Sequence, residues 1–193
     1  EFCKKAGAVF YHMSTLSVSG NGMKNDLPAA IFTENDHDVG QIWENNIYVK
    51  SKFLAERLVF DAEKNGMICK IFRLGRLVGR MSDGRFQINP GTNAFYLLLK
   101  GVMQIGAIPK EFADIKTDIM PVDLAVKEVL ALRNGESTAY HIMNFDPPTF
   151  LEILKAIADD VIVADRAKFG NIFNEKLATM DRELAAVDFS KLS

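Results

Sequence analysis

A tyrosine and a lysine four residues apart are the first candidates for chemistry in this chain. Tyr48 and Lys52 fall in a stretch of helical character, and side chains at this spacing lie on one face of a helix. A positive charge beside a phenol favours the phenolate, so the spacing suits a proton-transfer pair. The same spacing also arises by chance, and the alternative is an exposed helix pair without a role.

A cluster of hydroxyl residues precedes this pair and gives it a context. Ser14, Thr15 and Ser17 follow a short apolar stretch, where a loop can direct a hydroxyl toward the same pocket. One hydroxyl would bind a substrate carbonyl oxygen, Tyr48 would protonate that oxygen, and Lys52 would hold a cofactor ribose. This set of roles requires a hydride donor. The alternative is that the hydroxyls only satisfy backbone groups at the end of a strand.

The elements that must position these residues follow a strand–loop–helix–strand order. Residues 8–13 read as a buried strand, and residues 17–45 as an irregular loop on the substrate side. Apolar spacing predicts an amphipathic helix over 46–65, ended by Gly66. Residues 67–74 read as a second buried strand, closed by Gly75 and Gly79. This βαβ order predicts an α/β fold with a parallel sheet.

The rest of the chain alternates between helices and short strands before turning helical. The patterns predict helices over 92–104 and 122–133, strands over 118–120 and 140–144, and three short helices over 150–158, 165–176 and 179–187. We therefore predict two parts: residues 1–145 form a partial Rossmann-like catalytic region, and residues 146–193 form a small helical substrate lobe.

A glycine-rich cofactor motif is missing from this sequence. No G-x-G-x-x-G stands between a strand and a helix, and only about four strands are readable. The chain begins abruptly, without the pattern of a signal peptide. We therefore expect a fragment whose dinucleotide site is incomplete and whose sheet edges are open.

Composition excludes several classes of partner. The net charge is −2, with basic and acidic residues spread along the chain, so we expect no nucleic-acid binding. No apolar run approaches the roughly 20 residues of a membrane span, so we expect no membrane insertion. The two cysteines lack metal-site spacing, which predicts no metal site and suits a cytoplasmic location.

Three motifs in order resemble a known family. They are Ser14-Thr15-x-Ser17-Val18, Tyr48-x-x-x-Lys52 and Phe72-Arg73-x-Gly75-Arg76-x-x-Gly79. Together they resemble the extended short-chain dehydrogenases/reductases. Within that group the sequence is most similar to the thioester reductase domains of nonribosomal peptide synthetases and carboxylic acid reductases. This similarity lies in the motifs Phe53-Leu54-Ala55-Glu56 and Met120-Pro121-Val122-Asp123. The resemblance covers roughly residues 8–145, and the chain looks like the carboxyl-terminal part of such a doubly wound domain.

This resemblance implies an activity and a set of site residues. In that family, NADPH reduces a phosphopantetheine-bound acyl or peptidyl thioester on a carrier protein, which releases an aldehyde that some members reduce to the alcohol. By resemblance, Thr15, Tyr48 and Lys52 are the catalytic residues, with Thr15 favoured over Ser14. Lys52, Arg73 and Gly75 are the residues expected to contact the cofactor.

Several alternatives stay open at the level of sequence. Arg73, Gly75 and Gly79 are equally well explained as a strand end and its turns. The same triad serves nucleotide-sugar epimerases and dehydratases, which act on an alcohol or ketone. A third hypothesis is an inactive fragment that only binds a carrier protein. The choice between NADP and NAD is read from residues that this sequence does not contain.

Overall fold

The computed structural model describes residues 2–20, 22–23, 31–43 and 46–177. Two compact units form: one comprises Glu1–Gly84 with Ile119–Asn144, and the other comprises Arg85–Asp118 with Phe145–Ser193. Among the described residues, no helix combines the length and the apolar character needed to cross a membrane.

The first unit is built on a parallel sheet of three strands. β1 (Phe10–Thr15) pairs with β2 (Cys69–Leu74), which pairs with β6 (Ala139–Ile142), so the strand order is β1-β2-β6. Helix α2 (Ile47–Lys64) joins β1 to β2. The predicted βαβ order and the predicted α/β fold with a parallel sheet are therefore confirmed.

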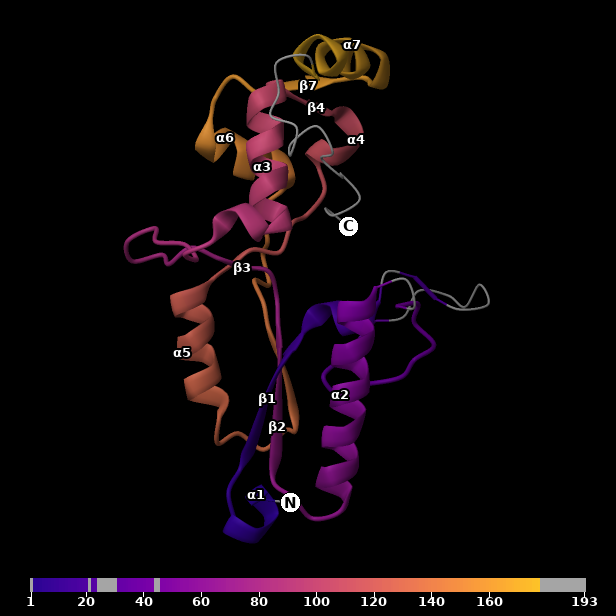
Figure 1. Ribbon diagram of the computed structural model, residues 1–193, viewed down its shortest axis with the longest axis vertical. Coiled ribbons are helices and arrows are strands. Elements are labelled where there is room, and N and C mark those ends of the chain that lie inside the picture. Colours follow the sequence, from indigo (N-terminus) through magenta and orange to yellow (C-terminus); the bar gives the residue numbers. More distant parts are fainter. Residues whose placement is uncertain (1, 21, 24–30, 44–45, 178–193) are drawn as a thin grey trace. The chain divides into compact units, whose positions relative to one another are not determined.

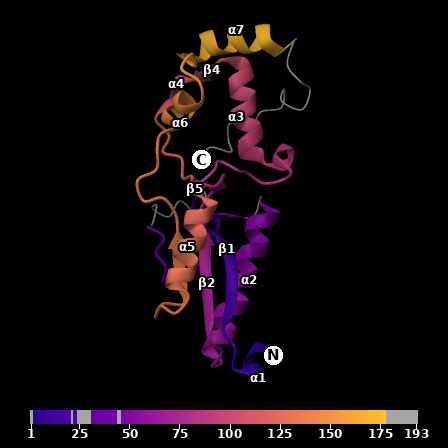
Figure 2. The same ribbon diagram turned by 90° about the vertical axis from the view of Figure 1, so that its left-hand side faces the viewer.

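Two helices cover the opposite faces of this sheet, α2 on one side and α5 (Val122–Leu132) on the other (Figures 1 and 2). Side chains alternate along β2, because successive residues of a strand point to opposite faces. Cys69 and Ile71 belong to the core that includes Val59 of α2, whereas Phe72 belongs to the core that includes Ala125 of α5. The result is a three-layer arrangement of helix, sheet and helix.

Helix α2 begins and ends on local signals. The side chain of Asn46 accepts a hydrogen bond from the Val49 backbone N–H at 3.1 Å, which satisfies one of the free donors of the first turn. The chain leaves the helix through Gly66, whose φ of 82° favours glycine. The shorter elements of this unit are α1 (Phe2–Ala6), η1 (Leu16–Ser19), β3 (Leu77–Val78) and β5 (Met120–Pro121).

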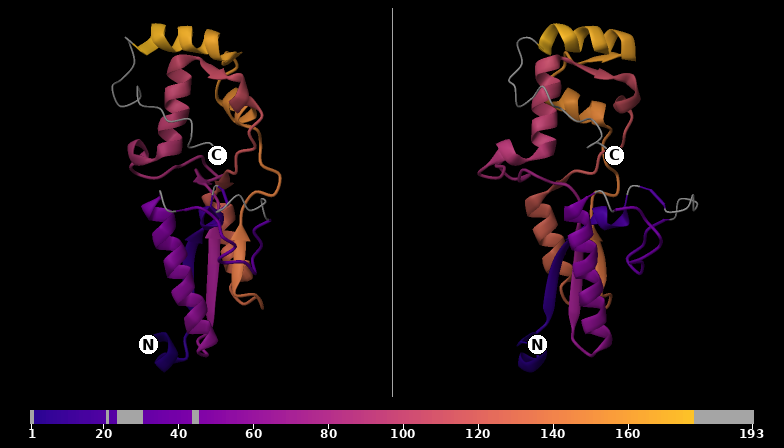
Figure 3. Two further views of the ribbon diagram at one scale, coloured as in Figure 1. Left: turned by 90° about the vertical axis from the view of Figure 1, so that its right-hand side faces the viewer. Right: turned by 45° about the vertical axis from the view of Figure 1, so that its right-hand side comes forward.

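Within the described residues, the second unit combines four α-helices with a pair of short strands (Figure 3). Its elements are η3 (Pro90–Thr92), α3 (Ala94–Ile105), β4 (Ala107–Pro109), α4 (Lys110–Ala113), α6 (Phe150–Ile157), β7 (Ile162–Ala164) and α7 (Arg166–Leu177). Its core includes Val102, Ile108, Phe150 and Leu154, all fully buried. The predicted helices at 92–104, 150–158 and 165–176 are confirmed, and the one at 179–187 lies outside the described residues.

Strands β4 and β7 were not predicted, and they change how this part of the chain is grouped. They pair in parallel from Ala107↔Ile162 to Pro109↔Ala164. The pairing ties residues 85–118 to the carboxyl-terminal helices, where the sequence analysis placed them with the first part. The predicted boundary at residue 145 stays a prediction.

A row of polar side chains crosses the sheet beneath α2. Ser14 on β1 stands opposite Arg73 on β2, which stands opposite His141 on β6. Glu56 of α2 lies over this row: its carboxylate accepts from Arg73 Nη2 at 2.9 Å, from Arg73 Nε at 3.1 Å and from Ser14 Oγ. Glu56 and Arg73 have no exposed side-chain surface. Such a pair must stay matched, because either charge alone would be buried without compensation.

Two histidines beneath α2 have a lowered pKa. Burial lowers the pKa of His141 below its ordinary value near 6.5, and the charge of Arg73 lowers it further. Burial, and then the charge of Lys52, lowers the pKa of His12 in the same way. The carboxylates that act in the opposite direction are Glu34, Glu56 and Asp36 for His141, and Glu56 for His12.

Replacing Glu56 by glutamine is expected to destabilise the first unit strongly. Glu56→Gln leaves the Arg73 charge buried without its partner, which typically costs about 3–5 kcal/mol in the free energy of unfolding. Trp43 is the single tryptophan of the chain and stacks on Phe53 of α2, so its fluorescence during urea unfolding reports on this unit. Asp61→Asn removes an exposed helix pair and serves as the control, with an unchanged midpoint. Equal midpoints for the two variants would contradict a structural role for the buried pair.

Acidification is expected to destabilise the same unit. Because the folded-state pKa values of His12 and His141 lie below the unfolded value, the unfolded chain binds more protons as the pH falls below about 6.5. The free energy of unfolding should therefore be highest above about pH 6.5 and decline as the pH falls below that value. His141→Gln should show a shallower decline over this range in urea titrations. An unchanged slope would mean that His141 does not contribute.

Candidate active site

Tyr48 and Lys52 lie one turn apart near the start of α2. The Lys52 Nζ atom lies 6.0 Å from the centre of the Tyr48 ring and donates a hydrogen bond to the Met13 carbonyl at 2.8 Å. Lys52 therefore reaches the carboxyl end of β1, two residues before Thr15. The Tyr48 side chain is 56% exposed, and its hydroxyl makes no hydrogen bond within the described part of the chain. The structure thus places Lys52 at the end of β1, with the Tyr48 ring beside it on the same face of α2.

The hydroxyls at the end of β1 have different surroundings. Ser14 Oγ donates to the buried carboxylate of Glu56, so this hydroxyl belongs to the polar row. Thr15 closes the strand and caps η1: its Oγ1 accepts from the Ser17 N–H at 3.3 Å and donates to Ser17 Oγ at 3.3 Å. Both Thr15 contacts are long for hydrogen bonds, whereas the Ser14 hydroxyl is hydrogen-bonded to the charged Glu56 carboxylate. Thr15 is the hydroxyl of the two that is less firmly engaged.

Arg73 is fully buried, and Gly75 is half-buried. The Arg73 guanidinium is fully buried and donates to Glu56, to the carbonyls of Thr33 and Asp36, and to His141 Nε2. The Gly75 N–H donates to the Ile142 carbonyl at 2.8 Å and continues the sheet. The cofactor contacts assigned to these two residues stay predictions, while their observed contacts all lie inside the first unit.

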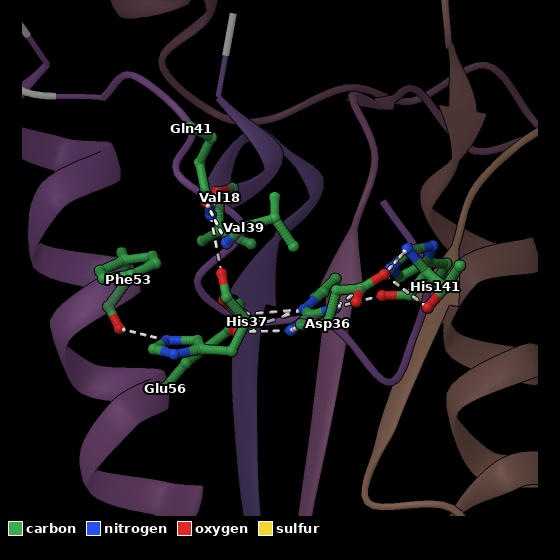
Figure 4. Close-up of polar contacts among 11 residues, drawn as sticks. Val18, Asp36, His37, Val39, Gln41, Phe53, Glu56 and His141 are labelled. Atoms are coloured by element: carbon green, nitrogen blue, oxygen red, sulfur yellow. Dashed lines mark hydrogen bonds and ion pairs between the residues drawn. The ribbon is translucent and has the colours of Figure 1, made fainter. Parts of the chain in front are cut away.

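Two residues near the site, Glu56 and Gln41, were not predicted from sequence as site residues. Glu56 follows Lys52 by four residues, so Tyr48, Lys52 and Glu56 share one stripe of α2. This spacing is the sequence feature from which Glu56 could have been predicted. Gln41 carried no signal, because it lies in a segment without periodicity. Its side chain is fully buried and bonds to the Val18 carbonyl in η1, next to Thr15 (Figure 4).

The donor set around Lys52 fits the sugar of a nicotinamide nucleotide. A lysine ammonium has three N–H donors, and one of them is used on the Met13 carbonyl. The remaining donors and the exposed Tyr48 phenol are available on the same helix face for ribose hydroxyls and a substrate oxygen. The described residues contain no group of three or more metal-ligating side chains.

A family model matches most of the chain. It is described as Male sterility protein, belongs to an NAD-binding family and covers residues 1–129. Among sequence relatives, one of the linear gramicidin synthase proteins of Brevibacillus parabrevis is 28% identical over 113 residues, which are 57% of this chain and 2% of that protein.

Solved structures of reductase domains resemble this chain in fold and sequence. A thiolation-reductase di-domain from an archaeal non-ribosomal peptide synthetase is 30% identical, with a TM-score of 0.83 over 96% of this chain and 40% of that one. The reductase domain of the aureusimine biosynthetic cluster is 25% identical, with a TM-score of 0.81 over 98% of this chain and 50% of that one. The chain therefore spans half or less of the length of these reductase structures.

These matches agree with the predicted resemblance, whose motifs all lie within residues 1–129. They bear out the predicted oxidoreductase class and a Rossmann-like fold of the kind that uses nicotinamide cofactors. The chain belongs to the NAD-binding family described as Male sterility protein, and its structural relatives are the reductase domains of nonribosomal peptide synthetases.

Proposed function

We propose that this chain supplies the proton-transfer half of a reductase that releases a carrier-bound acyl or peptidyl thioester as an aldehyde. One observation carries the proposal: Lys52 shares a helix face with Tyr48 and reaches the Met13 carbonyl beside Thr15. On this proposal, the three chemical roles meet at the end of β1. The similarity to reductase domains of peptide synthetases supports the choice of a thioester as substrate.

Each residue has one task in the proposed reaction. NADPH, when bound, would supply a hydride to the thioester carbonyl carbon. Thr15 donates a hydrogen bond to the carbonyl oxygen, and Tyr48 transfers its phenol proton to that oxygen as negative charge develops. Lys52 binds the ribose, and its charge stabilises the phenolate left on Tyr48. The resulting hemithioacetal loses the pantetheine thiol and leaves the aldehyde. A second round of the same chemistry would give the alcohol.

The proposed partner is a carrier protein that presents the substrate on phosphopantetheine. The archaeal relative is a thiolation-reductase di-domain, which joins a carrier and a reductase in one structure. We propose the carrier partner because of that similarity. We propose NADPH, rather than NADH, because of the resemblance of the motifs.

The edge of the sheet indicates where the rest of such a reductase would pack. β1 is one of the two outer strands of the three-stranded sheet among the described residues, and an apolar groove flanks it on each face. Leu58 of α2 is 70% exposed, and Val126 and Leu130 of α5 are each 52% exposed. An open strand edge between two apolar helix faces suits a further strand with its own covering helices. We propose that this edge receives the amino-terminal half, which would contain the glycine-rich motif.

Tyr48→Phe tests the proposed proton donor. In a reductase completed by its amino-terminal half, the variant lacks the proton for the carbonyl oxygen, so turnover of an acyl-pantetheine thioester with NADPH should fall by about 10²–10⁴-fold. NADPH binding should change little, because Lys52 is intact. Tyr11→Phe, on the same sheet but outside the site, serves as the matched control. Turnover at the wild-type rate in Tyr48→Phe would show that the assigned role is wrong, and preference for nucleotide sugars would show that the substrate class is wrong.

Assembly with a separate amino-terminal half tests the proposed docking edge. NADPH fluorescence should change when the chain is mixed with that half, and the chain alone should show no change at the same concentrations. Leu58→Asp places a charge on the edge and should weaken assembly at least tenfold. Ile88→Asp, on the fully exposed Ile88 of the other unit, is the matched control. NADPH binding by the chain alone, with the affinity of the mixture, would contradict the proposal.

A further inference from the structure

Residues 33–43 form a compact segment that contacts η1, α2 and β2 of the first unit. We name this segment the brace. It lies between α2 and the strands of the first unit (Figure 4). Its residues fall in the stretch 17–45, which is predicted from sequence as an irregular loop on the substrate side. Its polar groups are instead satisfied by contacts to the sheet, to η1 and to α2.

One end of the brace is held by Gln41. The Gln41 amide Nε2 donates to the Val18 carbonyl at 2.9 Å and to the His37 carbonyl at 2.7 Å, and Oε1 accepts from the Val39 N–H at 2.9 Å. The side chain has no exposed surface. Both hydrogens and the oxygen of this amide are therefore used, and no smaller or apolar side chain could make the same three bonds.

The other end of the brace is held by Arg73. The guanidinium donates to the Thr33 carbonyl at 3.1 Å and to the Asp36 carbonyl at 2.6 Å. The Asp36 carboxylate accepts from the Thr33 N–H at 2.7 Å and from Thr33 Oγ1 at 2.6 Å, which closes the turn that presents these carbonyls. The charge pair beneath α2 thus also fixes the start of the brace.

Between its ends, the brace packs on α2 one residue after Lys52. The His37 ring stacks on Phe53 with centroids 4.2 Å apart, and its Nε2 lies 3.0 Å from the Phe53 carbonyl oxygen. Trp43 stacks on the same ring at 4.7 Å. Phe53 itself is buried. The brace therefore contacts the helix that carries Tyr48 and Lys52 at the turn that carries Lys52.

The turn after Thr15 fits closely against the brace. Gly20 ends η1 with a φ of 75°, and a Cβ atom there would lie 2.7 Å from the Ile42 carbonyl oxygen and 2.8 Å from Gln41 Cβ. Neither the backbone conformation nor the space accepts a larger residue. The brace therefore contacts η1 through Gln41 and at Gly20, and η1 begins directly after Thr15.

We infer that Gln41 is a positioning residue, which holds the η1 turn, and with it the Thr15 hydroxyl, against the Tyr48–Lys52 face of α2. This inference rests on the proposed function. Thr15 has only long contacts to Ser17, so its own side chain does not fix where the hydroxyl points. The Val18 carbonyl, three residues on, is the point where the turn is bonded to a rigid group. A displacement of about 1 Å at a reacting group can cost about 10²-fold in rate.

The test is Gln41→Met in the complete reductase that contains this chain. Methionine keeps the length of the side chain and removes all three hydrogen bonds. The expected result is a fall in kcat of about 10–100-fold, with the KM for NADPH within twofold of the wild type, because Lys52 keeps its contact to Met13. Gln87→Ala is the matched control, since Gln87 is exposed and lies in the other unit. The substrate is an acyl-pantetheine thioester.

A double-mutant cycle separates positioning from a general loss of structure. If Gln41 acts through Thr15, Gln41→Met should lower kcat no further in a Thr15→Ala background. Independent, multiplicative losses in the double variant would overturn the inference, and so would an unchanged kcat in Gln41→Met. If Gln41→Met fails to fold, Gln41→Asn keeps a polar amide and is judged by the same two criteria.

Failure of the proposed function gives a different pattern. Full turnover in both Tyr48→Phe and Thr15→Ala would mean that the proposed chemistry is wrong. A loss in Tyr48→Phe without a loss in Thr15→Ala would keep the proton donor and overturn the positioning role of Gln41.

Discussion

The buried pair of Glu56 and Arg73 is the constraint on which the arrangement of this unit depends. Apolar packing between a helix and a sheet is non-directional, so it allows a helix to shift along the sheet at little cost. A fully buried carboxylate and guanidinium allow no such shift, because each charge needs the other at hydrogen-bond distance. The pair therefore sets the position of α2 relative to β1 and β2, and with it the position of the two residues that precede Glu56 on the same stripe.

The proposed chemistry depends on this position of α2 relative to the sheet. Tyr48 and Lys52 reach the end of β1 because Glu56, one turn further on, is bonded to Ser14 of that strand and to Arg73 of the next. Arg73 also holds the start of the brace, and Gln41 holds the other end on η1. The site is thus assembled from segments that are far apart in sequence, and each is held by a buried polar group rather than by apolar contact alone.

Much of the first unit could be predicted from sequence, because its signals are local. The spacing of apolar residues in α2, the runs of β2 and the stop at Gly66 each lie within one short window. Strands β4 and β7 have three residues each, too few to show a period, and they exist because they pair with each other across about 50 residues of chain. The grouping of residues 85–118 with the carboxyl-terminal helices follows from that pairing.

The sequence by itself determined the helix face that carries Tyr48 and Lys52, a strand just before the hydroxyl residues Ser14 and Thr15, and the membership of a reductase family, since these depend on spacing and on motif order. Only the tertiary structure decided what Arg73, Glu56 and Gln41 do. An arginine at a strand end is equally consistent with a ligand contact and with a buried ion pair, and its partners here lie 17 to 68 residues away. Whether a polar side chain is free or committed depends on groups that only folding brings beside it.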